Sequence, residues 1–146
     1  MKGSESDIQT FLLDTNVFIS AIKEPKKQTD ALSLIIKIIE NPNIKLVGNE
    51  LLAQEMLRYA ELLKSETATT VLVALLSKTD IVRVHENYRK ICKAYIKTQD
   101  KADILHAATC LQTDAVLITN DKHFDLIRDE VIIKVWSTTE AIKKLL

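Results

Sequence analysis

Short apolar runs alternate with longer helical patterns along this chain, and that alternation restricts its possible folds more than any other feature. The runs have the length and the β-branched content of buried strands. They lie at residues 9–13, 44–47, 81–84, 115–119 and 131–135. Strands separated by helices need crossover connections, which join parallel neighbours. The pattern therefore predicts an α/β fold: a three-layer α/β/α sandwich with a central parallel sheet of about five strands.

The segments between these runs repeat apolar side chains with the spacing of amphipathic helices. Predicted helices cover residues 17–23, 30–39, 50–64, 65–76, 86–98, 100–112 and 122–128. Ser137 and Glu140 have the spacing of a capping box and predict a C-terminal helix that starts there. Pro25 cannot continue a helix, so residues 24–27 are predicted to form a charged loop.

The composition indicates one domain. The chain has 146 residues, of which 47% are hydrophobic, and this is enough for one sizeable core. Only two Gly and two Pro leave little room for a turn-rich all-β fold or a long linker. We expect a frayed N-terminus at residues 1–7 and a single domain at residues 8–146.

Cysteine usage and hydropathy predict a cytoplasmic protein with no membrane partner. Cys92 and Cys110 are far apart and form no CxxC pair, so we expect reduced thiols in the core. The polar start lacks the apolar segment of a signal peptide, and no apolar run approaches the roughly 20 residues that span a bilayer. The 20 basic residues balance 20 acidic ones, so any nucleic-acid binding would depend on local patches.

Two of the predicted strands are followed closely by an acid. Asp14 follows the first run and precedes a helical pattern, and Asp121 follows the run at residues 115–119. Ligands of open α/β sheets bind outside the carboxyl ends of the strands, where the strand order reverses. If these two strands are neighbours at that point, both acids face one crevice. Each acid alone could instead cap the helix that follows it.

Glu55 lies on the core-facing stripe of the predicted helix 50–64, between Leu52 and Tyr59. An unpaired buried carboxylate is costly, so Glu55 needs a partner. A buried Arg or Lys would be the structural partner, and a metal ion would be the functional one. Glu50 also follows the second strand, but it falls on the polar side of the helix.

Asp103 lies one turn into the predicted helix 100–112, on a face with few other polar residues. With Asp14, Glu55 and Asp121 it would complete a group of four carboxylates. Such a group needs cations to offset its mutual repulsion, and oxygen-only ligation favours Mg²⁺ or Mn²⁺ over Zn²⁺. This chemistry suits phosphodiester hydrolysis. Taken alone, Asp100 and Asp103 are more simply explained as a helix cap.

The acids lie in four short motifs that together resemble the PIN-domain ribonucleases, including VapC toxins and stand-alone prokaryotic PIN proteins. The motifs are Leu12-Leu13-Asp14-Thr15-Asn16, Glu55-Met56-Leu57-Arg58, Asp103-Ile104-Leu105-His106-Ala107-Ala108 and Leu117-Ile118-Thr119-Asn120-Asp121-Lys122-His123-Phe124. Each motif is weak alone, whereas four in this order and spacing are fairly specific. The similarity spans essentially the whole chain.

The resemblance implies a five-stranded parallel sheet, Mg²⁺- or Mn²⁺-dependent cleavage of RNA, frequent homodimers and, for a toxin, an antitoxin partner. In the family, the acids that match Asp14, Glu55, Asp103 and Asp121 hold the metal, and the position of Thr15 or Asn16 supports it. We also expect supporting roles for Asp100, Thr119 and Asn120.

Basic residues near the third and fourth motifs are candidate RNA contacts. Arg89, Lys93 and Lys97 recur every four residues in the predicted helix 86–98, and Lys122 and His123 follow Asp121. Phosphate contacts of this kind position a strand without reading its sequence. The alternative for the helix is an ordinary solvated face.

Other protein classes share parts of this pattern. Haloacid-dehalogenase phosphatases also begin with a strand and an Asp, but they need a second Asp where this chain has Asn16. A response-regulator receiver needs an Asp after a middle strand. In this chain the middle run at residues 81–84 is followed by His85 and Glu86 instead. A zinc site is not indicated, because the chain has neither an HExxH motif nor a Cys pair. A PIN-like fold that only binds RNA or protein remains the alternative from a different functional class.

Overall fold

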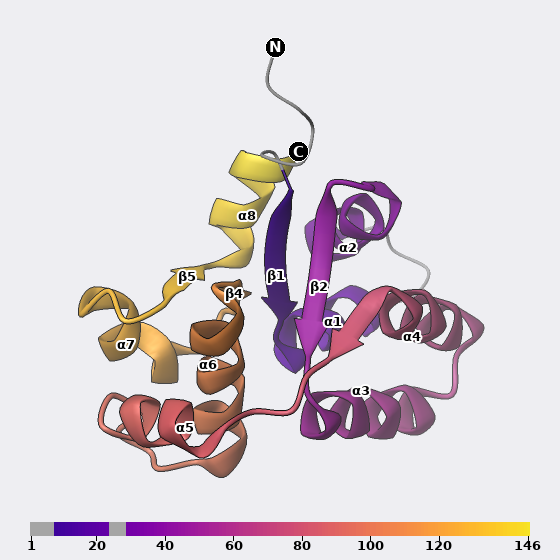
Figure 1. Cartoon of the computed structure of the whole chain (residues 1–146). Helices are drawn as coiled ribbons and strands as arrows, with labels where there is room; N and C mark the ends of the chain where they lie inside the picture. Colours follow the sequence, from indigo (N-terminus) through magenta and orange to yellow (C-terminus); the bar gives the residue numbers. More distant parts are fainter. Residues whose placement is uncertain (1–7, 24–28) are drawn as a thin grey trace.

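The computed structural model describes residues 8–23 and 29–146; the expected frayed N-terminus and the charged loop at 24–27 lie outside these residues. A five-stranded sheet, parallel at every pairing, forms the middle of the fold (Figure 1). Its order is β3 (Thr79–Ile81), β2 (Ile44–Gly48), β1 (Gln9–Leu13), β4 (Val116–Ile118) and β5 (Lys134–Trp136). The strand order reverses between β1 and β4, as the sequence required for Asp14 and Asp121 to face each other.

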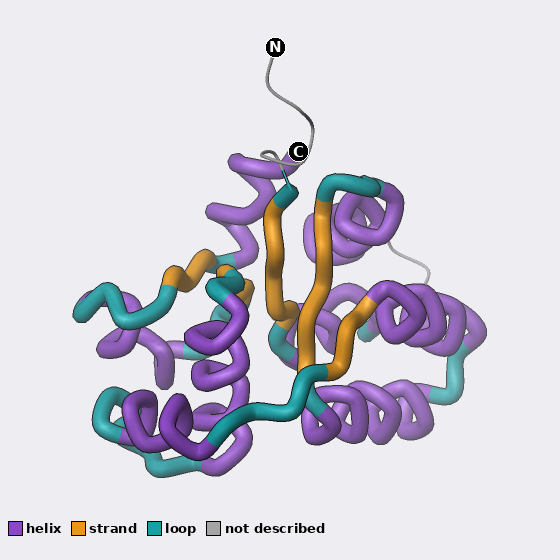
Figure 2. Tube along the Cα trace, viewed as in Figure 1, coloured by secondary structure: helices purple, strands orange, loops and turns teal. Residues whose placement is uncertain are grey.

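Helices alternate with the strands and cover both faces of the sheet (Figure 2). One layer contains α1 (Thr15–Ile22), α2 (Asp30–Glu40), α4 (Glu66–Lys78) and α8 (Thr138–Leu145); the other contains α5 (Glu86–Lys93) and α6 (Lys101–Thr113). The helix α3 (Glu50–Leu63) lies next to the carboxyl ends of the strands, and η2 (Lys122–Phe124) and α7 (Asp125–Asp129) connect β4 to β5. The predicted three-layer α/β/α sandwich is confirmed.

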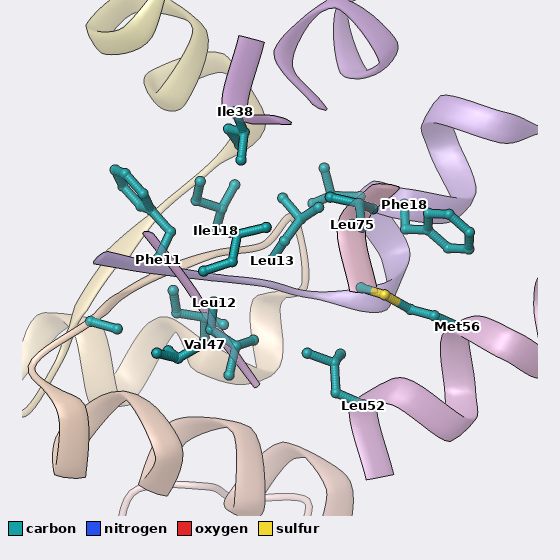
Figure 3. Close-up of a cluster of buried hydrophobic side chains, with 14 of the residues drawn as sticks. Phe11, Leu12, Leu13, Phe18, Ile38, Val47, Leu52, Met56, Leu75 and Ile118 are labelled. Atoms are coloured by element: carbon teal, nitrogen blue, oxygen red, sulfur yellow. The ribbon is translucent and has the colours of Figure 1, made fainter. Parts of the chain in front are cut away.

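Alternate residues of the central strand enter the two halves of the core (Figure 3). Phe11 and Leu13 face the layer that contains Ile38 of α2, and Leu12 faces the opposite layer with Val47. All three β1 side chains are at most 2% exposed. A central strand buried on both faces holds its C-terminal end rigidly, which fixes the position of Asp14.

The predicted helix at residues 86–98 is shorter than expected, because α5 ends at Lys93. Gln99 has a left-handed backbone with a φ of 56°, and its side-chain amide donates to the carbonyls of Lys93 and Ile96. These bonds cap the end of α5 and turn the chain toward α6. Lys97 therefore does not continue the helical face of Arg89 and Lys93.

The predicted bounds of both edge strands differ from those in the structure by a few residues. The third strand was predicted at residues 81–84, but β3 starts at Thr79, opposite Leu46. The last strand was predicted from Val131, which instead has a φ of 55° and closes a turn after α7 by donating to the Arg128 carbonyl. Apolar alternation marked these runs, but the neighbouring strand sets which residues pair.

The apolar face of α3 is also narrower than its sequence indicates. Leu52, Met56 and Ala60 are buried, whereas Leu62 is 68% and Leu63 is 38% exposed. Both leucines lie in the last turn of α3, so the buried face of the helix ends at Ala60. In the part of the chain that is described, no helix is long and apolar enough to cross a bilayer.

Candidate functional site

Asp14 lies at the C-terminal end of β1 and caps α1. Its backbone N–H donates to the Ile118 carbonyl (3.0 Å), which continues the pairing of β1 with β4. The Oδ1 atom accepts from the Thr15 backbone N–H (2.8 Å), and Oδ2 accepts from the Thr119 hydroxyl (2.7 Å). The residue is 7% exposed. Asp14 therefore caps the helix and also faces the end of β4, so the two explanations are not exclusive.

Thr119 connects the first acid to the fourth. Its hydroxyl donates to Asp14 and accepts the backbone N–H of Asp121 (3.0 Å). The Asn16 side-chain amide lies 3.3 Å from the same oxygen as a second donor. The Oδ1 atom of Asn16 is buried without a hydrogen-bond partner among the described residues. A buried acceptor with no donor can bind water or a cation.

Glu55 reaches this edge of the sheet from α3. Its Oε1 atom accepts from the Thr15 hydroxyl (3.0 Å) and lies 3.1 Å from His106 Nε2. The Glu55 side chain is 26% exposed, so it is half-buried rather than fully in the core. Its hydrogen-bond partners are His106 and Thr15, and not the buried Arg or Lys considered from the sequence. The His106 hydrogen bond is the main cause that lowers the pKa of Glu55 below 4.5.

His106 belongs to a buried chain of polar side chains that the sequence did not reveal. Its Nδ1 atom lies 3.1 Å from the side-chain amide of Asn49, and the same amide donates to Thr109 (3.0 Å). His106 is 1% and Asn49 is 2% exposed. His106 lies in the third motif and Asn49 directly precedes the predicted helix 50–64, but the sequence patterns assign neither residue to the site. A His on an otherwise apolar helix was the available signal, because a buried imidazole needs polar partners.

Asp103, Asp121 and His123 form a second group. His123 Nδ1 lies 2.9 Å from Asp103 Oδ2 and 3.2 Å from Asp121 Oδ1. One ligand atom from each of the three residues fits within 4.8 Å of the others. Asp103 projects from α6 toward the η2 turn, which brings the third and fourth motifs together.

The electrostatics of the acids differ with their surroundings. Burial raises the pKa of Asp14 above 3.8, and the Asp121 carboxylate adds to that rise, although the Thr119 hydrogen bond opposes it. Burial also raises the pKa of Asp103 above 3.8, and the carboxylates of Asp100 and Asp121 act in the same direction. The Asp103 hydrogen bond is the main cause that raises the pKa of His123 above 6.5.

These donors fit a divalent cation. Repulsion between Asp121 and each of its acidic neighbours favours a bound positive charge. Carboxylate oxygens suit Mg²⁺ and Mn²⁺, and an imidazole nitrogen beside them is better tolerated by Mn²⁺. The ligand atoms that fit within 4.8 Å of one another belong to Asp103, Asp121 and His123, and among the described residues neither Asp14 nor Glu55 joins this group.

Two of the residues expected to support the metal site form hydrogen bonds outside it. Asp100 caps α6 by accepting the backbone N–H groups of Ala102 (2.8 Å) and Asp103 (3.1 Å). Asn120 exchanges two hydrogen bonds with Thr138 at the start of α8. Asp100 thus acts on Asp103 through the helix start, and Asn120 connects the end of β4 to the C-terminal helix.

The candidate RNA contacts divide into two places. Arg89 and Lys93 line a hollow of about 620 Å³ together with Lys101 and the apolar Leu51 and Leu105. Asp103 lies two residues from both Lys101 and Leu105, so helical spacing places it on the other side of α6. Lys97 is exposed and does not line the hollow. Lys122 and His123 are exposed on η2, directly after Asp121.

Comparison with known proteins gives the same fold. No curated protein matches the chain. The structure of VapBC2 from Rickettsia felis, bound to a DNA fragment from its promoter, aligns with a TM-score of 0.62 and 17% identity over 88% of this chain and 98% of that one. VapBC-1 from nontypeable Haemophilus influenzae aligns with a TM-score of 0.62 and 22% identity over 90% of this chain and 99% of that one. The PIN domain family model matches residues 11–130. With all four motifs inside that range, the chain belongs to the PIN domain family.

Proposed function

We propose that this protein is a metal-dependent ribonuclease whose site is formed by Asp14, Glu55, Asp103 and Asp121. The observation that carries the proposal is the shared hydroxyl of Thr119, which bonds Asp14 Oδ2 and the backbone of Asp121 at adjacent strand ends. Asp14 and Asp121 follow neighbouring strands at the edge of the sheet where α/β proteins bind ligands. Glu55 accepts from Thr15 beside the first acid, and Asp103 lies 2.9 Å from His123 beside the second. Membership of the PIN domain family supports the same chemistry.

The four carboxylates would hold Mg²⁺ or Mn²⁺, with His123 beside two of them. A bound cation supplies Lewis-acid activation of water and of the phosphodiester oxygen. The protein contributes a fixed arrangement of charge. Thr15 and Thr119 restrain Glu55 and Asp14 by hydrogen bonds, so the carboxylates need little reorganisation when the cation arrives.

The RNA strand would approach over the basic residues near this edge. Lys122 and His123 follow Asp121 on η2, where they can meet a phosphate next to the scissile bond. Arg89 and Lys93 would contact a more distant part of the strand, since their hollow opens on the other side of α6. Lys97, outside the helix, is the weakest of the proposed contacts.

We further propose that the protein is the toxin of a toxin–antitoxin pair. The support is structural similarity to VapBC-1 and VapBC2, which extends over nearly the full length of the compared chains. A small antitoxin and a second copy of the chain would be its protein partners. Co-expression with the product of an adjacent small gene tests this point, because an antitoxin should co-purify and suppress RNA cleavage.

The catalytic proposal is tested with Asp14→Asn and Glu55→Gln. Cleavage of RNA in Mn²⁺ should fall by more than the roughly 10- to 100-fold that loss of an outer partner of a metal ligand costs. Glu50→Gln is the matched control, since Glu50 is an exposed acid at the start of the same helix as Glu55. Unchanged cleavage in both variants would contradict the proposal. RNA binding without any Mn²⁺-dependent cleavage in the wild type would instead favour a binding scaffold.

A further inference from the structure

The two oxygens of Glu55 have different surroundings. Oε1 accepts from the Thr15 hydroxyl at 3.0 Å and lies 3.1 Å from His106 Nε2. None of the described residues donates a hydrogen bond to Oε2. A carboxylate bound in this way has one oxygen restrained by the protein and the other free for a ligand.

The hydrogen-bond network determines which nitrogen of His106 carries the proton. Asn49 Oδ1 accepts the backbone N–H of Leu52 (2.8 Å), which identifies the other side-chain atom as the donating amide. Thr109 donates its hydroxyl to the Leu105 carbonyl (2.7 Å), so its oxygen accepts from that amide. The second amide hydrogen then points at His106 Nδ1, which must accept. The proton of a neutral imidazole is left on Nε2, where it is donated to Glu55.

The part of this network that faces away from Glu55 is buried and fully hydrogen-bonded. His106 and Asn49 are 1% and 2% exposed, and Thr109 is fully buried. Asn49 directly follows β2 and caps α3, the helix that carries Glu55. His106 is on α6, which packs against β1, β2 and β4. The contact with His106 therefore joins Glu55 to a helix packed against the sheet rather than to a surface side chain.

We infer that His106, oriented by Asn49, is a positioning residue that holds Glu55 by Oε1 and leaves Oε2 to the cation. This inference rests on the proposed metal-dependent function. His106 touches neither substrate nor cation in this arrangement. It acts by fixing the rotamer of Glu55, as outer partners of metal-binding carboxylates do.

Mn²⁺ binding to the purified, folded protein measures this role by calorimetry. His106→Leu removes the donor at similar volume, and its Mn²⁺ affinity should fall about 10- to 100-fold. His106→Gln supplies an amide donor to Glu55 and should stay within a few-fold of the wild type. Cys92→Ala is the control, because it opens a cavity under the neighbouring helix α5 and touches none of the four proposed ligands. Its Mn²⁺ affinity should be unchanged.

Equal Mn²⁺ affinity in the wild type and in folded His106→Leu would overturn the inference alone. A wild type that neither binds Mn²⁺ nor cleaves RNA would overturn the proposed function, and this inference with it. If His106→Leu does not fold, the ¹⁵N spectrum of the metal-free wild type decides. It should show His106 protonated on Nε2, and a proton on Nδ1 would overturn the inference.

Discussion

The hydroxyl of Thr119 lies 2.7 Å from Asp14 Oδ2 and donates a hydrogen bond to it. The two residues are 105 positions apart in the chain and directly follow the neighbouring strands β1 and β4. The bond is buried and lowers the pKa of Asp14, in opposition to the larger effect of burial. One hydroxyl thus keeps a buried acid closer to its charged form.

Replacing Thr119 by Val should weaken Mn²⁺ binding by about 10- to 100-fold, because Asp14 loses its donor at nearly constant volume. Thr119→Ser keeps the hydroxyl and should stay near the wild-type affinity. Calorimetric titration with Mn²⁺ measures both. If Thr119→Val binds as tightly as the wild type, the hydroxyl has no part in preparing the site.

The pH dependence of Mn²⁺ binding follows from two raised pKa values. Asp14 and Asp103 both titrate above 3.8 in the folded protein, mainly because they are buried. Protons compete with the cation, so affinity should fall as the pH drops toward and through these pKa values. Each displaced proton contributes up to about a tenfold change per pH unit. Affinity that stays constant down to about pH 4 would contradict raised pKa values at the site.

The same shifts act on stability in the metal-free protein. An acid with a raised folded-state pKa destabilises the fold once it ionises, so the contributions of Asp14 and Asp103 worsen as the pH rises through that value. Glu55 behaves oppositely, since its pKa is lowered from 4.5. Its contribution is present above pH 4.5 and is lost as the pH falls through the folded-state pKa. Mn²⁺ should therefore raise the melting temperature more at neutral than at acidic pH.

The double substitution Arg89→Ala with Lys93→Ala should weaken RNA binding and reduce its salt slope by about two, one for each lost phosphate contact. Fluorescence anisotropy over a salt series measures the slope. Lys143→Ala is the control, because Lys143 is exposed on α8 in the opposite layer. An unchanged slope in the double variant would show that this part of α5 is an ordinary solvated face.

Lys78 stabilises the end of α2 from a different helix. Its ammonium donates to the carbonyls of Ile38 (2.6 Å), Ile39 (3.2 Å) and Asn41 (2.7 Å). Lys78→Met should lower the free energy of unfolding by about 1–2 kcal/mol, because these carbonyls lose a charged donor. Lys37→Met removes a charge from the same helix end but none of these bonds, and urea denaturation should separate the two. If both variants lost the same free energy of unfolding, the positive charge near the helix end would be the stabilising factor and the three hydrogen bonds would not.

Sequence patterns located those parts of the site that belong to a strand end. Asp14 directly follows β1, Asp121 comes three residues after β4, and a parallel sheet brings such strand ends to one edge. The bond between Glu55 and His106 depends instead on how α3 and α6 pack, and no local pattern records that angle. The partner of Glu55 was therefore expected to be an Arg, a Lys or a metal.

The end of α5 illustrates a second limit. Residues 86–98 contain neither Gly nor Pro, so local propensity gave no reason to stop the helix. The side chain of Gln99, which folds back onto the carbonyls of Lys93 and Ile96, ends it. Tertiary contacts also placed β3 two residues earlier than apolar alternation did.

Asn49 has consequences for how this protein tolerates mutation. Its oxygen caps α3, a task that Ser and Asp perform equally well. Its two amide hydrogens are donated to Thr109 and His106, whereas Ser offers one donor and an ionised Asp offers none. A library of variants selected for folding alone would accept several residues at position 49. A library selected for RNA cleavage would retain Asn, so the two selections would diverge at a residue that is only 2% exposed and carries no charge.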